Sequence, residues 1–114
     1  MLSIAICDDE EYFRTTEKKL ISKYMAGKNC ECMIDMYESG KELLALRSAI
    51  SQYNIIFLDV NMEEIDGIET AKEIRKISKD VFIVFVTAFI TYALEGYKVD
   101  AVRYLIKDHE SLSL

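Results

Sequence analysis

The sequence predicts an α/β fold, a doubly wound parallel sheet of five strands with helices on both faces. Five short apolar runs alternate with segments of helical period, the pattern expected of right-handed crossover units. The chain has no proline, no linker rich in glycine and serine, and no internal repeat. These features indicate a single domain over residues 1–114.

The expected strands follow the apolar runs. The runs at 2–7 (LSIAIC), 55–60 (IIFLDV) and 81–87 (VFIVFVT) are apolar at nearly every position, which is typical of central parallel strands. The run at 32–37 (CMIDMY) alternates more and is expected at an edge of the sheet. The run at 101–106 (AVRYLI) supplies the fifth strand.

The expected helices lie between these strands. Ser39 and Asp66 are suited to be the N-caps of the second and third helices. A short fourth helix over 91–98 is interrupted by Gly96, and the fifth is truncated because 107–114 supplies at most one turn. The apolar positions of the first three helices are Phe13, Leu20, Ile21 and Tyr24; Leu43, Leu44, Leu46 and Ile50; and Ile68, Ala71, Ile74 and Ile77.

Composition narrows the function classes. A net charge of -6 and a pI near 4.8 argue against nucleic-acid binding by this segment. No apolar stretch is long enough to span a bilayer, and Asp8 and Asp9 interrupt the first apolar run, unlike a signal peptide. The three cysteines are odd in number, and Cys30 and Cys32 are too close for an ordinary bridge. We therefore expect reduced thiols in a cytoplasmic protein, with Cys7 buried.

Four consecutive acidic residues, 8–11, directly follow the first expected strand. They either cap the next helix or form part of a cation site. Three other polar residues also end expected strands, namely Asp59, Thr87 and Lys107. Because the carboxyl ends of parallel strands share one edge of a sheet, these side chains are expected to converge there.

Each of these residues also has an ordinary interpretation, as a cap, a turn former, a filler or a surface charge. Their combination favours a site instead. Asp8, Asp9 and Asp59 offer oxygen ligands suited to Mg²⁺, and Thr87 and Lys107 could hold an anion. One carboxylate could then accept a phosphoryl group while the metal and the lysine offset its charge.

These motifs together resemble the receiver domain of bacterial two-component response regulators, over essentially the whole chain. The matching segments are ICDDEE, IIFLDVNM, DGIETAKEIRK, FVTAF and ALEGYKVDAVRYLIK. The last two look most like receivers that carry a LytTR-type DNA-binding domain downstream. The resemblance implies the flavodoxin-like strand order 2-1-3-4-5.

The resemblance also assigns roles. Asp59 would be phosphorylated, Asp9 would bind Mg²⁺ directly, and Asp8 would bind it mainly through water. Asn61 would contribute its backbone carbonyl to the metal. The remaining roles are phosphoryl binding by Thr87 and the Ala88 amide, pairing of the phosphoryl group with Lys107, and rotamer switching by Tyr104.

Two positions depart from the family pattern. Asp108 follows the lysine where the family usually has a proline after a cis bond, and a cis bond without proline costs about 3 kcal/mol. Glu63 stands four residues after Asp59, where proline is also usual. Its negative charge beside the site should disfavour a phosphoryl group.

The resemblance implies a signalling switch that a sensor histidine kinase phosphorylates on Asp59. Such a switch is not an enzyme beyond self-phosphorylation and slow self-dephosphorylation, and it would reach DNA only through an output domain. One alternative is a Mg²⁺-dependent phosphohydrolase with an aspartyl-phosphate intermediate, but Asn61 stands where its second acid is expected. The other is a degenerate binding module that no longer takes phosphate. The truncated fifth helix further suggests self-association, either by a symmetric homodimer that covers exposed apolar residues or by an exchanged element.

Overall fold

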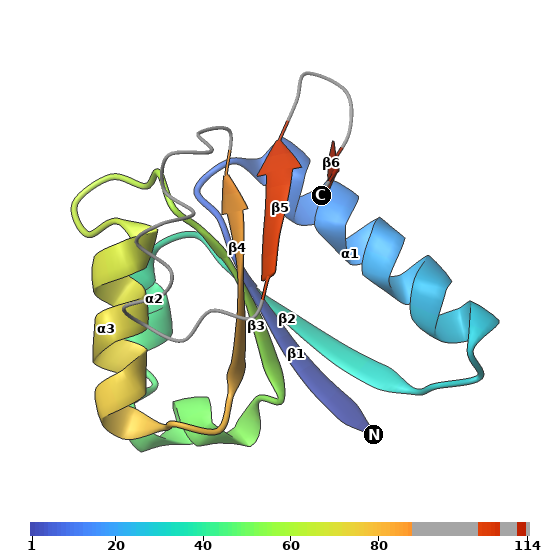
Figure 1. Ribbon diagram of the computed structural model, residues 1–114, viewed down its shortest axis with the longest axis horizontal. Helices are drawn as coiled ribbons and strands as arrows, with labels where there is room; N and C mark the ends of the chain where they lie inside the picture. The colour runs from blue at the N-terminus through green and yellow to red at the C-terminus, as the bar shows by residue number, and fades with distance from the viewer. Residues whose placement is uncertain (88–102, 108–111, 114) are drawn as a thin grey trace.

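A computed structural model describes residues 1–87, 103–107 and 112–113 of the chain (Figure 1). From Thr87 onward the description covers the backbone of the strands alone. The helical elements are α1 (Glu11–Gly27), α2 (Gly40–Leu44), the 3-10 helix η1 (Arg47–Gln52) and α3 (Gly67–Ile77). The strands are β1 (Leu2–Cys7), β2 (Cys32–Tyr37), β3 (Ile55–Asp59), β4 (Phe82–Thr87), β5 (Arg103–Lys107) and β6 (Leu112–Ser113).

The sheet confirms the parallel α/β prediction over its first four strands. β2, β1, β3 and β4 lie in that order and are all parallel, with the alternating strand β2 at the edge. Cys7 pairs with Leu58, and Asp59 pairs with Val86. This register brings the carboxyl ends of the three central strands to one level, where the polar residues follow.

The carboxyl-terminal part of the sheet contains an element that the sequence did not predict. β5 pairs with β4 in parallel, and β6 pairs with β5 in antiparallel orientation. Leu112 and Ser113 therefore add a strand where a helical turn was expected, so that expectation is wrong for these two residues. An uncovered strand edge exposes unpaired backbone groups, which a short added strand can satisfy. The helix expected over 91–98 lies outside the described residues.

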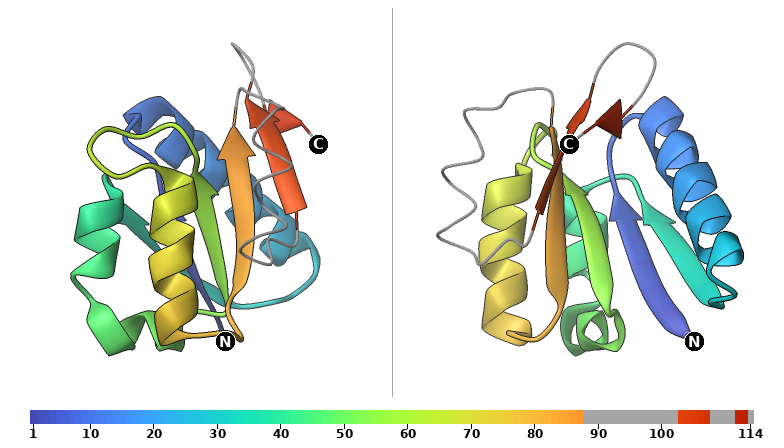
Figure 2. Two further views of the ribbon diagram at one scale, coloured as in Figure 1. Left: turned by 60° about the vertical axis from the view of Figure 1, so that its left-hand side comes forward. Right: turned by 45° about the vertical axis from the view of Figure 1, so that its right-hand side comes forward.

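Helices lie on both faces of the sheet, as a doubly wound fold requires. Figure 2 shows α1 on one face and α2 and α3 on the other. The side chains packed between the sheet and the α2–α3 layer form a continuous core. It includes Ala5, Cys7, Leu43, Ile56, Leu58, Ala71, Ile74, Ile83 and Phe85, all fully buried. None of the helices in the described part of the chain is long and apolar enough to cross a membrane.

Both predicted N-caps are present. The Ser39 side chain accepts a hydrogen bond from the Glu42 amide at 3.0 Å, and the Asp66 side chain accepts one from the Glu69 amide at 2.9 Å. The second helix is shorter than predicted, because α2 ends at Leu44 and η1 follows it. Arg47 has a φ of 50°, a left-handed conformation that an α-helix cannot continue through.

The inward face of α1 differs from the predicted one. Phe13 and Ile21 are partly buried as expected, but Leu20 is 49% exposed and Tyr24 is 62% exposed. Glu17 lies between them on the buried side and is only 2% exposed. The helix is thus rotated so that a stripe at steps of four residues, with Glu17 at its centre, faces the sheet.

Candidate functional site

The structure brings three of the predicted acidic residues together. Asp8 and Asp9 follow β1, and Asp59 is the last residue of the neighbouring β3. Each offers a carboxylate oxygen, and these oxygens all lie within 4.8 Å of one another. Asp8 and Asp59 are 0% and 1% exposed, whereas Asp9 is exposed. A cluster of this kind is suited to a cation, because a bound positive charge offsets the repulsion among three carboxylates at such distances.

The local backbone holds the acidic pair in front of α1. The Asp8 amide donates to the Tyr37 carbonyl at 3.1 Å, which extends the β1–β2 pairing by one residue. The Glu10 amide donates to Asp8 Oδ1 at 2.9 Å. The N-cap of α1 is Glu10, whose side chain makes no capping hydrogen bond. Helix capping therefore does not explain Asp8 and Asp9, and the cation-site interpretation is the one that the geometry supports.

Asp59 is fixed by the turn that follows it. The Val60 amide donates to the Val86 carbonyl on β4 at 3.3 Å, and the Gly67 amide donates to the Val60 carbonyl at 2.8 Å. The first turn of α3 thus packs directly against the end of β3. This contact orients the backbone of the residue that precedes Val60, the buried Asp59.

Cys7, directly before Asp8 in the chain, carries a buried thiol whose pKa is shifted by its surroundings. Burial raises the pKa of Cys7, and the charges of Asp8 and Asp59 raise it further. Its Sγ lies 3.8 Å from the Met62 Sδ, a contact between two soft apolar groups. The predicted burial of Cys7 is confirmed, and its thiol stays protonated and packs in the core.

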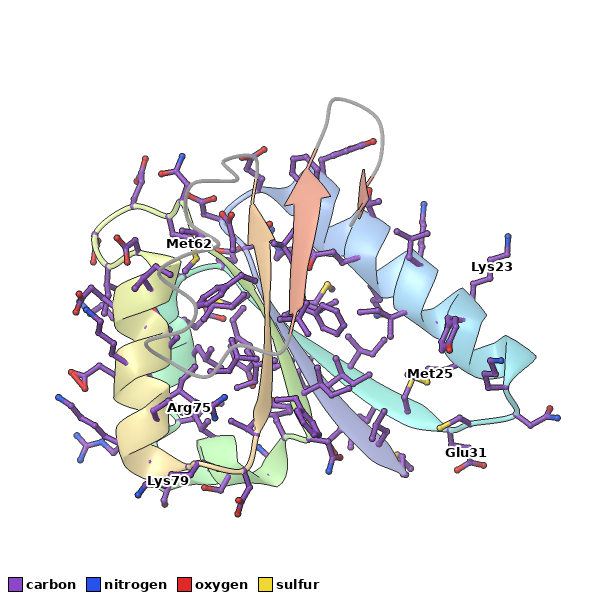
Figure 3. The ribbon with its side chains drawn as sticks, viewed as in Figure 1. Lys23, Met25, Glu31, Met62, Arg75 and Lys79 are labelled. Carbon is purple, nitrogen blue, oxygen red and sulfur yellow. The ribbon has the colours of Figure 1, made fainter. Side chains whose placement is uncertain are left out.

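A small cavity opens beside the acidic cluster. Its volume is about 330 Å³, and it is lined by Asp9, Glu10, Asn61, Met62 and Glu63. Figure 3 places Met62 at the carboxyl end of the strands, the edge where the acidic residues also lie. Three of its lining residues are acidic and none is basic, so its opening is negatively charged. A larger cavity of about 510 Å³ has Leu2, Tyr53, Ile77 and Phe82 in its lining and contains none of the predicted site residues.

The other predicted residues are placed only through their strands. Thr87 ends β4 and pairs with Ile106, so Lys107 ends β5 one residue further along the same edge. Tyr104 pairs with Phe85 on β4. The side chains of Thr87, Tyr104 and Lys107, together with Ala88 and Asp108, lie outside the described residues.

Sequence reasoning missed one basic residue beside the acids. Arg14, in the first turns of α1, donates from Nη1 to the Asp8 carbonyl at 2.8 Å. Its position five residues after Asp9, near the start of an expected helix, was the available signal. The three acids of the cluster offer carboxylate oxygens, the hard ligands that Mg²⁺ prefers. The residues present therefore fit this ion.

Comparisons with known proteins agree with this geometry. A family model described as the response regulator receiver domain matches residues 4–114. The chain is 34% identical over 108 residues to the sensory transduction protein LytT of Oceanobacillus iheyensis, covering 93% of this chain and 42% of that protein. It is 32% identical over 102 residues to the transcriptional regulatory protein LytR of Staphylococcus aureus, covering 90% of this chain and 39% of that protein. The chain thus spans about two fifths of the length of these relatives.

Solved structures share the fold. The response regulator TrrA of Thermotoga maritima, in complex with Mg²⁺ and BeF, is 33% identical with a TM-score of 0.76, covering 96% of this chain and 90% of that one. The response regulator domain of Thermotoga maritima CheB is 21% identical with a TM-score of 0.79, covering 100% of this chain and 84% of that one, and supports the fold alone. The chain belongs to the response regulator receiver domain family, and it is similar to the receivers of LytT and LytR regulators.

Proposed function

We propose that this domain is a phosphorylation-dependent switch that accepts one phosphoryl group on Asp59 in the presence of Mg²⁺. The observation that carries the proposal is the convergence of the Asp8, Asp9 and Asp59 carboxylates within 4.8 Å. The family consists of signalling switches, and the donor would be the phosphohistidine of a sensor histidine kinase. Self-phosphorylation and slow self-dephosphorylation would be its only chemistry.

The metal would be held by Asp8, Asp9, Asp59 and the backbone carbonyl of Asn61. When bound, Mg²⁺ supplies charge that offsets the negative oxygens of the transferring group. On the other side, Thr87 and the Ala88 amide would receive the phosphoryl oxygens, and Lys107 would pair with them. The placement of Thr87 and Lys107 at the ends of adjacent strands supports this division of roles.

The reaction is a transfer between two nucleophiles. A carboxylate oxygen of Asp59 forms a bond to phosphorus while the bond from phosphorus to the donor's imidazole nitrogen breaks, and the leaving imidazole keeps the electron pair. Asp59 is 1% exposed, so little water competes with it for the phosphoryl group. Water later attacks the phosphorus of the acyl phosphate, which restores the carboxylate and releases inorganic phosphate. As long as Asp59 carries the phosphoryl group, Tyr104 would report the phosphorylated state by its rotamer.

The remaining features of the proposal concern the whole protein. We place β5 as the fifth strand of the 2-1-3-4-5 order and residues 1–114 as one receiver domain. A LytTR-type output domain would contact DNA, since the receiver itself is acidic. Three free cysteines support a cytoplasmic location.

Intact-mass analysis after incubation with acetyl phosphate tests the proposal. The protein should gain the mass of one phosphoryl group with Mg²⁺ and none with a chelator. Released inorganic phosphate should remain close to one equivalent during the first minutes. Many equivalents released rapidly would favour the phosphohydrolase alternative, and no mass gain under any of these conditions would favour the binding module.

Mg²⁺ should raise the melting temperature of the domain, because it binds only the folded cluster. At a concentration one hundred times its Kd the stabilisation is about 2.7 kcal/mol. Asp9→Ala should lose most of this stabilisation, and it should also make the metal-free protein more stable because one repelling charge is removed. Glu31→Ala is the matched control, since Glu31 lies far from Met62 in Figure 3, and it should respond like the wild type. A wild-type melting curve that ignores millimolar Mg²⁺ would refute the metal site.

The domain should self-associate through the face that carries α1. Leu20, Met36 and Phe82 are 49%, 41% and 56% exposed. Phe82 alternates along β4 with the core residue Ile83, which places it on the α1 side. We expect a dimer that buries these side chains, detectable by light scattering. Leu20→Lys should weaken the dimer, whereas Ile77→Lys on α3 of the other face should not. A monomeric wild type at high concentration would contradict this.

A further inference from the structure

We propose that Arg14 is a positioning residue of the acidic cluster, which sets the domain's affinity for Mg²⁺ without contacting the metal. The inference rests on the proposed function only in taking Mg²⁺ as the ion. Arg14 belongs to α1, yet its guanidinium contacts two other segments, the loop after β1 and the loop after β2. It therefore joins three parts of the chain directly beside the cluster.

The contacts are specific to a guanidinium. Nη1 donates to the Asp8 carbonyl at 2.8 Å, and Nη2 lies 3.4 Å from Glu38 Oε1. The Arg14 side chain is only 12% exposed, so its hydrogen bond to the carbonyl is shielded from water. Two nitrogen atoms of one planar fork thus reach two partners at once, which a lysine ammonium on a flexible stem does not reproduce.

The carbonyl that accepts the hydrogen bond from Arg14 belongs to Asp8, one of the three acids of the cluster. Asp8 makes hydrogen bonds through its backbone and its side chain. Its amide donates to the Tyr37 carbonyl, its side chain accepts from the Glu10 amide, and its carbonyl accepts from Arg14. These three bonds fix the peptide group between Asp8 and Asp9. Since that peptide group sets the direction of both carboxylates relative to Asp59, loosening it should widen the cluster. Groups that orient metal ligands in this way typically change metal affinity 10- to 100-fold when removed.

The ion pair with Glu38 contributes less. Glu38 is 72% exposed, and exposed ion pairs of this kind add little to stability. The role of Glu38 is to hold the guanidinium plane in place while Nη1 donates to the Asp8 carbonyl. The proposal therefore assigns the effect to the hydrogen bond with Asp8.

Positioning of the cluster by Arg14 and the positive charge of Arg14 have opposite expected effects on the affinity for Mg²⁺. Arg14 is a cation near the site of another cation, so its charge alone opposes Mg²⁺ binding. If charge dominated, Arg14→Gln would bind Mg²⁺ more tightly than the wild type. If positioning dominates, the same variant binds Mg²⁺ more weakly. The sign of the change separates the two accounts.

The experiment is calorimetric titration of the metal-free protein with Mg²⁺ at fixed pH and ionic strength, without phosphodonor. Arg14→Gln should raise the Kd about tenfold, and Arg14→Lys, which keeps the charge but not the fork, should also raise it. Glu38→Gln should stay within about threefold of the wild type, as expected of an exposed pair. Phosphorylation of Arg14→Gln should approach the wild-type rate when Mg²⁺ is raised in proportion.

Arg75→Gln is the matched control. Arg75 also donates to a backbone carbonyl, that of Val81 at 2.7 Å, and Figure 3 places it away from Met62, toward the other end of α3. Its loss should lower the free energy of unfolding in urea while leaving the Mg²⁺ affinity unchanged. Arg14→Gln or Arg14→Lys with wild-type or tighter affinity would overturn the proposal, as would an equal weakening in Arg75→Gln. Failure of the wild type to bind Mg²⁺ would instead refute the proposed function.

Discussion

Asp59→Asn should abolish phosphorylation of the domain by acetyl phosphate while leaving the domain folded. The amide oxygen of asparagine is a far weaker nucleophile than a carboxylate and cannot form the acyl phosphate. The side chain is almost isosteric, and Asp59 is 1% exposed at the end of β3, so the packing around it should persist. The intact mass of the variant should therefore remain that of the unmodified chain.

The same substitution should make the metal-free protein more stable. Asp59 lies within 4.8 Å of two further carboxylates, and replacing one of three like charges reduces their repulsion. The midpoint of urea unfolding should rise without Mg²⁺, and the stabilisation by Mg²⁺ should fall. A gain in stability together with a loss of labelling is the combination expected of a functional acid cluster.

Asp66→Asn is the matched control for this result. It is the same chemical change a few residues along the chain, at the N-cap of α3, where asparagine caps about as well as aspartate. Its labelling and stability should both stay close to the wild type. Labelling of Asp59→Asn to the wild-type extent would show that another residue accepts the phosphoryl group, and the assignment would be wrong.

Much of the fold was predictable because its signals are local. The boundaries of β1 and β2 coincide with the predicted apolar runs, and Ser39 and Asp66 cap the predicted helices. Strand periodicity and N-cap chemistry depend on residues adjacent in sequence, so both can be recognised in a single sequence. The acidic cluster was predictable for a related reason, since parallel strands place their carboxyl ends at one edge.

The features that the sequence did not reveal depend on contacts between distant segments. Glu17 faces the sheet although its charge predicts exposure, because the rotation of α1 is set by the whole packed face. β6 exists through its pairing with β5, and Leu112 and Ser113 alone carry no strand signal. The role proposed for Arg14 depends on the position of its guanidinium beside the Asp8 carbonyl, which the sequence alone does not give. In each case the deciding contact is with a segment that is not adjacent in sequence.

A second large effect is expected at the first residue of α3. Gly67 has a backbone conformation open to any residue, because no glycine in the described part of the chain has a positive φ. The requirement for glycine is spatial. A Cβ at this position would lie 2.1 Å from the Asp59 carbonyl oxygen and 2.7 Å from the Val60 Cα. Both are backbone atoms at the end of β3, which carries Asp59, the proposed phosphoacceptor, so neither can move as a flexible side chain would.

Gly67→Ala should therefore lower both the stability and the phosphorylation rate of the domain. Overpacking typically costs 1–3 kcal/mol, and a contact with backbone should place this variant at about 3 kcal/mol. Either α3 moves away, losing the hydrogen bond from the Gly67 amide to Val60, or the end of β3 shifts and misdirects Asp59. Urea unfolding measures the first effect, and the initial rate of mass gain at saturating Mg²⁺ measures the second.

Gly27→Ala is the matched control, because a Cβ at Gly27 meets nothing within 4 Å at the end of α1. Alanine is the better helix former, so this variant should be as stable as the wild type or up to about 1 kcal/mol more stable. Gly40→Ala should fall between the two, since its nearest obstacle is the Thr70 side chain at 2.2 Å and a side chain can partly adjust. Wild-type stability and labelling in Gly67→Ala would show that α3 does not set the position of Asp59, and the site would have to be held by β3 and β4 alone.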